Sequence, residues 1–211
     1  MYHNTIFIIS APSGTGKTSI IQTLLKQLDT AKLSISYTTR KKRPQEKNGE
    51  HYHFIPYDQF DNMIKQDKFL EYTKIFGNFY GTSRIEIEKL LSNHQDILLD
   101  INWQGANQIR QHLPQSCSIF ILPPSKNELM KRLCSRGQDS RQSIKQRFAQ
   151  AVSDMKHYKE YDYVIINDNY NQAVCDLNNI IHAEKFKLYQ QIVRNNVIIS
   201  ELLTNSSTKN V

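Results

Sequence analysis

The sequence predicts an α/β protein with a parallel sheet core and helices on both faces. Four apolar residues at 6–9, a turn of small residues and a helical pattern follow one another at the start of the chain. Apolar segments at 96–100, 118–122 and 163–166 then alternate with helical patterns, which is typical of a parallel sheet. Between these two regions, residues 35–82 have a mostly β pattern. We therefore expect one domain that contains a small, mostly β insertion.

The turn after the first strand has the composition of a phosphate-binding P-loop. Its residues are Ala11, Pro12, Ser13, Gly14, Thr15, Gly16, Lys17 and Thr18. The backbone N–H groups of such a turn and the positive end of the next helix face an anion. Lys17 can reach the β- and γ-phosphates, and the Thr18 hydroxyl can bind Mg²⁺. Ala11 replaces the first glycine of the usual pattern, and the alternative is an ordinary strand-to-helix turn with a solvated lysine.

The helix after this turn carries its apolar residues on one face and is expected to end near Leu28 or Asp29. The elements predicted next are a strand at 33–40, a tight turn at 48–49, a returning strand at 52–55, a helix at 57–67, and strands at 69–72 and 79–82 around a turn at 77–78.

The second half of the chain is predicted to alternate between helices and strands. The elements are a helix at 85–91, a strand at 96–100, a helix at 104–112, a strand at 118–122, helices at 128–135 and from a cap at Asp139 or Ser140 to 156, a strand at 163–166 and a helix at 171–191. The last helix is amphipathic, with Val174, Leu177, Ile180, Ile181 and Leu188 on one face. The polar tail after Leu203 is expected to fray.

The net charge of +7 is compatible with nucleic acid and equally with phosphorylated nucleotides. The surplus is concentrated at 40–43 and between 126 and 147. Local clusters on a protein with a phosphate-binding loop favour phosphate clamps, so no nucleic-acid partner is expected. The alternative, binding of nucleic acid through the basic charge, lacks a recognised reader motif.

The cysteines, Cys117, Cys134 and Cys175, are odd in number and far apart, which excludes a disulfide framework and favours a reducing compartment. No apolar run approaches the length of a membrane span, so no membrane partner is expected. The first strand begins almost at once and leaves no room for a signal peptide. These observations predict a cytoplasmic protein.

Nearly the whole chain resembles the guanylate kinase family. The resemblance lies in Ser10–Thr18, Ser36–Arg40 with Arg43-Pro44, Gly49–Tyr52, Phe69–Glu71, Gly77–Thr82, Leu99–Gly105, Arg132–Gly137 and Ile166–Asp168. It implies transfer of the γ-phosphoryl group of ATP to GMP, with Mg²⁺ as cofactor, in purine nucleotide metabolism and GMP recycling. It also implies a P-loop NTPase-type core at 1–34, 83–125 and 157–211, a GMP-binding insertion at 35–82 and a helical lid at 126–156, all within one domain at 4–190.

The resemblance assigns GMP binding to Ser36, Arg40, Arg43, Tyr52, Glu71, Tyr80, Thr82 and Asp100. The arginines and tyrosines suit the oxygens of the GMP phosphate. Glu71 can accept both N1–H and the 2-amino group of guanine, whereas the N1 lone pair of adenine would be repelled. Without the resemblance, each of these residues has an ordinary alternative. Arg43 could be a solvated surface side chain, Glu71 an exposed residue of a strand, and Asp100 a cap at the end of a strand.

The resemblance implies catalytic roles for Lys17, Arg132, Arg136 and Arg147, and ATP contacts for the loop residues 11–18 with Asn167 and Asp168. Thr18 and Asp100 are implied for Mg²⁺, Asp100 directly or through water. The lid arginines could equally lie on an ordinary charged helix face. Asn102 stands where the family often has a second aspartate, and no role is assigned to it.

Two further functions remain open from the sequence. A related kinase could phosphorylate a ribose phosphate, but such an acceptor has no base for Glu71, Ser36 and Thr82 to bind. A non-catalytic guanylate-kinase-like binding module would not need the intact loop with Lys17 and Thr18. The sequence is compatible with a monomer or a homo-oligomer.

Overall fold

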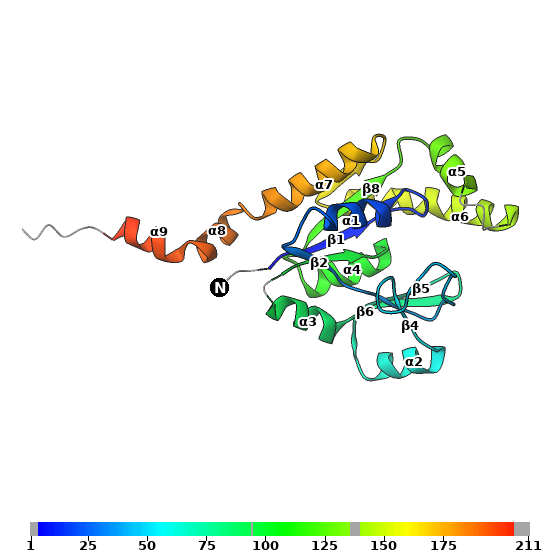
Figure 1. The fold of residues 1–211 in the computed structure, drawn as a ribbon, viewed down its shortest axis with the longest axis horizontal. Helices are drawn as coiled ribbons and strands as arrows, with labels where there is room; N and C mark the ends of the chain where they lie inside the picture. The colour runs from blue at the N-terminus through cyan, green and yellow to red at the C-terminus, as the bar shows by residue number, and fades with distance from the viewer. Residues whose placement is uncertain (1–3, 94, 136–139, 205–211) are drawn as a thin grey trace, which may run out of the picture.

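The computed structural model describes residues 4–93, 95–135 and 140–204. Five parallel strands form the main sheet in the order β2-β7-β1-β8-β9 (Figure 1). Their bounds are β1 Ile6–Ser10, β2 Ala31–Leu33, β7 Asp96–Asp100, β8 Cys117–Leu122 and β9 Tyr163–Ile166. The carboxyl ends of parallel strands share one edge, so the turn after β1 and Asp100 at the end of β7 lie together there.

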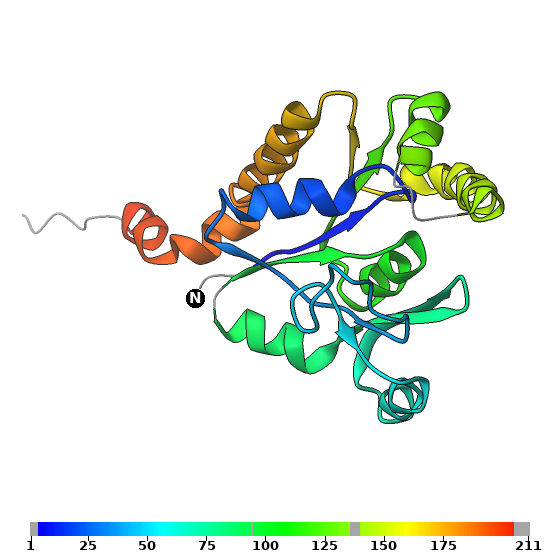
Figure 2. The same ribbon diagram turned by 45° about the vertical axis from the view of Figure 1, so that its right-hand side comes forward.

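Helices cover both faces of this sheet, as predicted (Figure 2). On one face, Phe7 and Ile9 of β1 pack against α1 (Lys17–Leu25) and α7 (Tyr170–Glu184). On the other, Ile6 and Ile8 pack with α3 (Arg84–Ser92) and α4 (Trp103–His112). Successive side chains of a strand point to opposite faces, so this apolar strand serves two cores at once.

A second sheet, in the order β4-β3-β6-β5, lies beside the main one. Its bounds are β3 Tyr37–Thr38, β4 His53–Phe54, β5 Phe69–Ile75 and β6 Asn78–Ser83. Helix α2 (Tyr57–Lys65) packs on it through Phe60, whose ring stacks on Phe69 at 4.3 Å and on Phe79 at 5.3 Å. This aromatic cluster joins α2 to β5 and β6, while Leu70 of β5 packs into the core of the main sheet.

Three predictions for this region were wrong in detail. The strand expected at 33–40 is two strands, because the chain leaves the main sheet after Ser34, whose N–H still bonds to Leu98, and enters the second sheet at Tyr37. The strand expected to return at 52–55 pairs with β3 in parallel, so the chain between them is a crossover. The hairpin turn is centred on Phe76 and Gly77, with φ of +46° and +80°, one residue before the expected position.

The segment predicted to form a lid, 126–156, contains α5 (Lys126–Ser135), α6 (Arg141–Asp154) and the start of a 3₁₀-helix, η1 (Met155–Glu160). The Ser140 side chain caps α6 by accepting a hydrogen bond from the N–H of Ser143 at 3.2 Å, which confirms that alternative for the cap. The other alternative, Asp139, lies outside the described residues. Leu129, Leu133 and Ala151 form a small apolar cluster between α5 and α6.

The first and last helices differ from their predicted bounds. Helix α1 ends at Leu25 instead of near 28. The helix predicted at 171–191 ends at Glu184, because Lys187 has the extended angles φ −57° and ψ 141°. Two short helices follow, α8 (Leu188–Arg194) and α9 (Asn196–Leu203), and they run away from the sheet in Figure 1.

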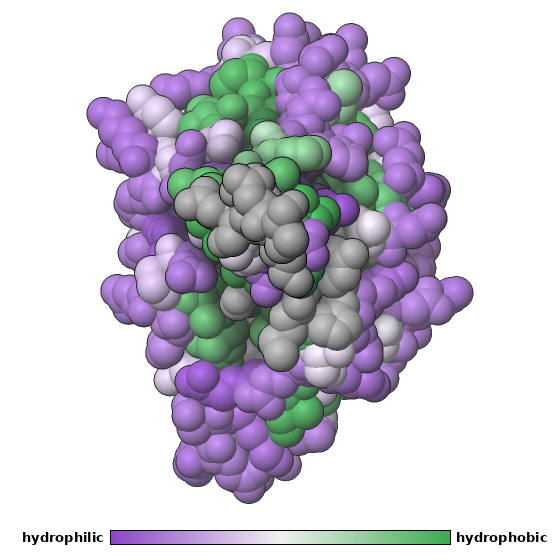
Figure 3. All heavy atoms as spheres, turned by 90° about the vertical axis from the view of Figure 1, so that its left-hand side faces the viewer, coloured by the Kyte–Doolittle hydropathy of each residue, from purple (hydrophilic) through white to green (hydrophobic). Residues whose placement is uncertain are grey.

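Leu188 is therefore 76% exposed, not part of the inward face of a long helix. Figure 3 views this end of the molecule and shows apolar surface among polar side chains. Apart from Thr204, the tail expected to fray lies outside the described residues. In the part of the chain that the structure describes, no helix combines the length and apolarity needed to cross a membrane.

Candidate active site

The turn between β1 and α1 has the backbone of an anion-binding loop. Gly14 and Gly16 have φ of +93° and +99°, a region that glycine adopts without strain. Gly16 is the N-cap of α1 and has no side chain to occupy the first N–H groups of the helix. These donors are therefore available to a phosphate at the positive end of the helix.

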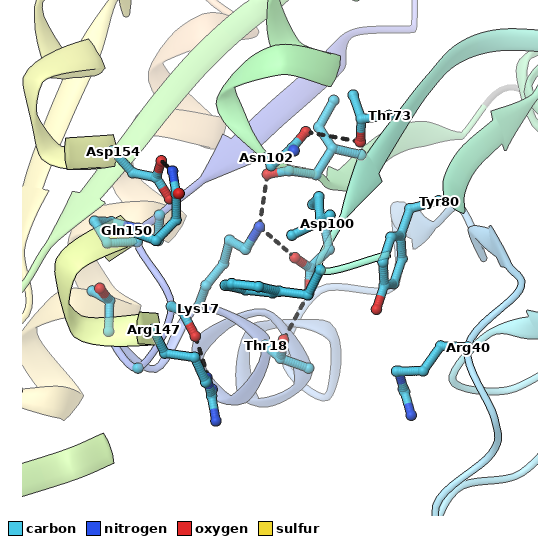
Figure 4. Close-up of a pocket in the computed structure, with 18 of the residues that line it drawn as sticks. Lys17, Thr18, Arg40, Thr73, Tyr80, Asp100, Asn102, Arg147, Gln150 and Asp154 are labelled. Carbon is cyan, nitrogen blue, oxygen red and sulfur yellow. Dashed lines mark hydrogen bonds and ion pairs between the residues drawn. The ribbon is translucent and has the colours of Figure 1, made fainter. Parts of the chain in front are cut away.

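The first two residues of α1 meet the end of β7. Lys17 Nζ lies 2.6 Å from Asp100 Oδ1 and donates to the carbonyl oxygen of Ile101 at 2.7 Å. The Thr18 hydroxyl donates to Asp100 Oδ2 at 2.8 Å (Figure 4). Asp100 lies beside Ile9 in the parallel register of β1 and β7, so the sheet itself brings these groups together.

Helix α5 and the end of β9 support the loop from behind. A Cβ at Gly14 would lie 2.8 Å from the side chain of Leu133, so the loop backbone packs directly on α5. Asn167 Nδ2 donates to the Thr15 carbonyl at 2.7 Å. Arg132 donates to the carbonyls of Thr15 and Asn167 at 3.3 and 3.2 Å. These contacts fix the conformation of the loop before any nucleotide binds.

Helix α6 contributes Arg147 to the open side of the loop. Its guanidinium donates to Ser13 Oγ at 2.8 Å and faces the cleft. Arg136, the remaining predicted lid arginine, lies outside the described residues. The loop is thus contacted from two directions, by α5 behind it and by α6 in front of it.

Glu71 is buried at the opposite side of the cleft, only 3% exposed. Burial raises the pKa of its carboxyl group to about 7, although hydrogen bonds from Thr82 and the charge of Lys17 act in the opposite direction. The Thr82 hydroxyl donates to Oε1 at 2.7 Å. A Cβ at Gly105 in α4 would contact Oε2, so the absence of a side chain there leaves room for this carboxylate.

The arginine and tyrosine residues expected to bind a phosphate converge near β3, β4 and β6. The Arg40 guanidinium forms a two-point ion pair with Glu46, at 2.7 and 3.1 Å, and lies over the Tyr52 ring. Burial opposes the charge of both partners, but their hydrogen bonding raises the pKa of Arg40 and lowers the pKa of Glu46. The rings of Tyr52 and Tyr80 meet edge to face at 5.9 Å. Burial also raises the pKa of Tyr52, so its phenol remains a donor.

One cleft of about 500 Å³ joins these two groups of residues. Among the described residues, its lining includes loop residues 11–18, Ser36, Arg40, Arg43, Tyr52, Glu71, Tyr80, Asp100 and Arg147. Figure 4 shows Lys17, Thr18 and Asp100 between Arg147 on one side and Tyr80 and Arg40 on the other. A site for a polyphosphate and a site for a second anion therefore open into the same space.

Comparison with known proteins gives the family. A sequence model described as guanylate kinase matches residues 3–184. The curated guanylate kinase of Escherichia coli (strain K12) is 53% identical over 207 residues, which is 97% of this chain and 100% of the relative. The chain belongs to the guanylate kinase family.

Other guanylate kinases agree over similar lengths. That of Buchnera aphidicola subsp. Baizongia pistaciae is 56% identical over 205 residues, covering 96% of this chain and 99% of the relative. The crystal structure of guanylate kinase from Anaplasma phagocytophilum matches with a TM-score of 0.77 at 30% identity, covering 96% of this chain and 97% of that one. The chain is an ATP:GMP phosphotransferase, and the ribose-phosphate kinase and the non-catalytic module are not favoured.

Among the described residues, four that were predicted for the guanylate kinase site do not line the cleft: Thr82, Arg132, Asn167 and Asp168. Thr82 contacts Glu71, while Asn167 and Arg132 support the loop. Asp168 is exposed at the end of β9. The first three would act through a neighbour that faces the cleft.

Several residues that shape this guanylate kinase site were not among those predicted from the sequence. Glu46 forms an ion pair with Arg40. In the sequence, the only indication of this pairing is that Glu46 is an acidic residue close to a basic run. Gly105 was part of a matching stretch, but nothing local indicated its contact with Glu71. Asn102 caps α4 by accepting from the N–H of Gly105 at 2.9 Å, a role that its place before a helix could have suggested.

Proposed function

We propose that the cleft binds ATP at the β1–α1 loop and GMP over the second sheet, and transfers the phosphoryl group directly between them. The observation that carries this proposal is the shared cleft, in which Lys17 and Asp100 face the same space as Glu71 and Tyr80. An oxygen of the GMP phosphate forms a bond to the γ-phosphorus of ATP. The bond from that phosphorus to the β–γ bridging oxygen breaks, and ADP leaves.

On the donor side, the loop backbone and Lys17 hold the phosphates, and Arg147 faces the γ-phosphoryl group. Negative charge is spread over the equatorial oxygens in the transition state, and fixed cations stabilise it there. Arg132, Asn167 and Thr15 keep the loop in shape. Arg136 and Asp168 remain predicted contacts on the same side.

The donor set near the loop fits Mg²⁺. The Thr18 hydroxyl and the Asp100 carboxylate are hard oxygen ligands 2.8 Å apart, and phosphate oxygens would complete the shell. Held by these two side chains, Mg²⁺ would supply positive charge that offsets the charge of the phosphates. Asp100 has to be shared between this role and its ion pair with Lys17.

On the acceptor side, Arg40, Arg43, Tyr52 and Tyr80 bind the GMP phosphate. Glu46 orients Arg40 through the two-point ion pair, which presents the guanidinium in one plane. It also accepts a hydrogen bond from the backbone N–H of Arg43 at 2.8 Å. Glu46 therefore holds Arg40 and Arg43 next to each other at the phosphate-binding end of the cleft.

Glu71 accepts the N1–H and 2-amino groups of guanine when it is ionised. Ser36 lines the same end of the cleft, and Thr82 holds one oxygen of the carboxylate. AMP would present a lone pair to this oxygen pair and leave it without donors. GMP is therefore the expected acceptor among the nucleoside monophosphates.

Water has to be excluded from the cleft during phosphoryl transfer, which requires parts of the chain on either side of the cleft to close on the core. We propose that residues 35–82 and 126–156 are these parts, acting against 1–34, 83–125 and 157–211. The separate second sheet and the separate α5–α6 cluster support this division.

A cytoplasmic location is proposed from the three free cysteines and the two nucleotide substrates. ATP and GMP are the proposed partners, without nucleic acid or membrane.

An ADP-release assay with Mg-ATP and each of GMP, AMP, CMP and UMP tests the proposal. Wild type is compared with Lys17→Ala, Glu71→Gln and the control Lys26→Ala, an exposed lysine at the end of the same helix. We expect turnover with GMP that Lys17→Ala abolishes, Glu71→Gln weakens and Lys26→Ala retains. Equal turnover with AMP, or full activity of Lys17→Ala, would overturn the assignment of the site.

A further inference from the structure

Trp103 joins the end of β7 to the lid region. It is the only tryptophan of the chain and the first residue of α4, three positions after Asp100. Its indole Nε1 donates to Asp154 Oδ1 at 3.0 Å, and its ring stacks on His157 with centroids 3.5 Å apart and planes at 9°. One side chain thus contacts two residues more than 50 positions away.

Asp154 stands at the base of the helix that carries Arg147. It is the last residue of α6, and its Oδ1 also accepts from Gln150 Nε2 at 2.8 Å. Residues 147, 150 and 154 are spaced by three and four, so they share one helix face, which lines the cleft. At the other end of this face, Arg147 donates to Ser13 Oγ. The face is therefore anchored at Trp103 and meets the loop at Ser13.

Trp103 contacts both sides of a junction in the backbone. The α-helix α6 ends at Asp154 and the 3₁₀-helix η1 begins at Met155. A change from α- to 3₁₀-geometry within a continuous helical segment often marks a hinge. The indole bonds to Asp154 before the change and stacks on His157 after it.

Helix η1 has a second tie to α4 that does not involve α6. His157 Nδ1 lies 2.6 Å from Glu160 Oε1, and Glu160 Oε2 lies 3.3 Å from the guanidinium of Arg110. The Arg110 guanidinium also lies over the Tyr161 ring, 4.7 Å from its centroid. The Arg110–Glu160 ion pair provides a matched control, because it joins α4 to η1 without contacting the last turn of α6.

We propose that Trp103 is a positioning residue for phosphoryl transfer. Its indole N–H fixes the last turn of α6 relative to Asp100, and so sets where Arg147 lies over the phosphate-binding loop. The inference rests on the guanylate kinase reaction and on the proposed role of Arg147. A side chain that only fills space would affect stability and not the placement of this arginine.

The test compares kcat, KM and Tm of Trp103→Phe, Asp154→Ala, Asp154→Asn and Arg110→Gln, with assays run well below the lowest Tm. Trp103→Phe keeps an aromatic ring but lacks the donor, and Asp154→Ala lacks the acceptor. Each is expected to lower kcat about tenfold, since small displacements of a catalytic group have effects of this order, with KM for GMP within about twofold. Asp154→Asn keeps Oδ1 and is expected to restore most of kcat. Arg110→Gln is expected to lower Tm and leave kcat unchanged.

A double-variant experiment shows whether Trp103 acts through Arg147. In an Arg147→Ala background, Trp103→Phe is expected to change kcat by less than about twofold, because coupled residues are not additive. The proposal is overturned if Trp103→Phe alone has the kcat of wild type, if its effect is undiminished in that background, or if Arg110→Gln lowers kcat equally. An inactive wild type would instead refute the proposed function.

Discussion

The raised pKa of Glu71 makes GMP binding depend on pH near neutrality. Burial raises this pKa to about 7, above the ordinary value of 4.5. Guanine offers two donors, so it binds the ionised carboxylate and not the acid. As pH falls through 7, protonation of Glu71 competes with GMP, and the apparent Kd must rise.

The expected size follows from the titration alone. With a pKa of about 7, half of Glu71 is ionised at pH 7 and about one tenth at pH 6, so the apparent Kd rises about tenfold between pH 8 and pH 6. The effect of pH on folding stability has the opposite direction to its effect on GMP binding. The native state holds a proton between pH 4.5 and about 7 that the unfolded chain has lost, so this group's contribution to stability decreases as pH rises through that window.

Calorimetric titration with guanosine measures this effect without interference from the GMP phosphate, which itself titrates near pH 6. Glu71→Gln is the control, and its weaker binding is expected to be flat between pH 6 and pH 8. Thr82→Val removes the hydroxyl donor to Oε1 and is expected to move the midpoint to higher pH, because that hydrogen bond favours the ionised form. A guanosine Kd for wild type that changes by less than about twofold between pH 6 and pH 8 would refute the reasoning.

Three further variants separate the parts of the site in steady-state assays. Lys17→Ala is expected to lower kcat by about 10²–10³ through loss of charge stabilisation, and a decrease of less than tenfold would contradict its role. Gly105→Ala places a methyl group against Glu71 and is expected to raise KM for GMP about tenfold, with KM for ATP as the unchanged control. Asn167→Ala leaves the Thr15 carbonyl with only the longer hydrogen bond from Arg132 and is expected to raise KM for ATP about tenfold, whereas an effect on GMP alone would contradict its place behind the loop.

The parts of the fold and site that sequence analysis predicted depend on local requirements. Gly14 and Gly16 mark backbone angles that other residues adopt with strain, and the apolar run before them is long enough for a buried strand. The alternation of apolar strands with helices predicted the parallel sheet, and the sheet brings Asp100 to Lys17. The acceptor residues came from a resemblance, because a β insertion does not indicate by its own pattern which side chains converge.

What only the tertiary structure decided involves residues far apart in the chain. The parallel pairing of β3 with β4, the end of α7 at Glu184 and the contact of Gly105 with Glu71 depend on the path of the whole chain. The same holds for Trp103 and Asp154, which are 51 positions apart. The sequence by itself determined the phosphate loop and the class of fold, since neighbouring residues specify backbone geometry. The burial that raises the pKa of Glu71 and the tie at the base of α6 arise only when distant segments pack together.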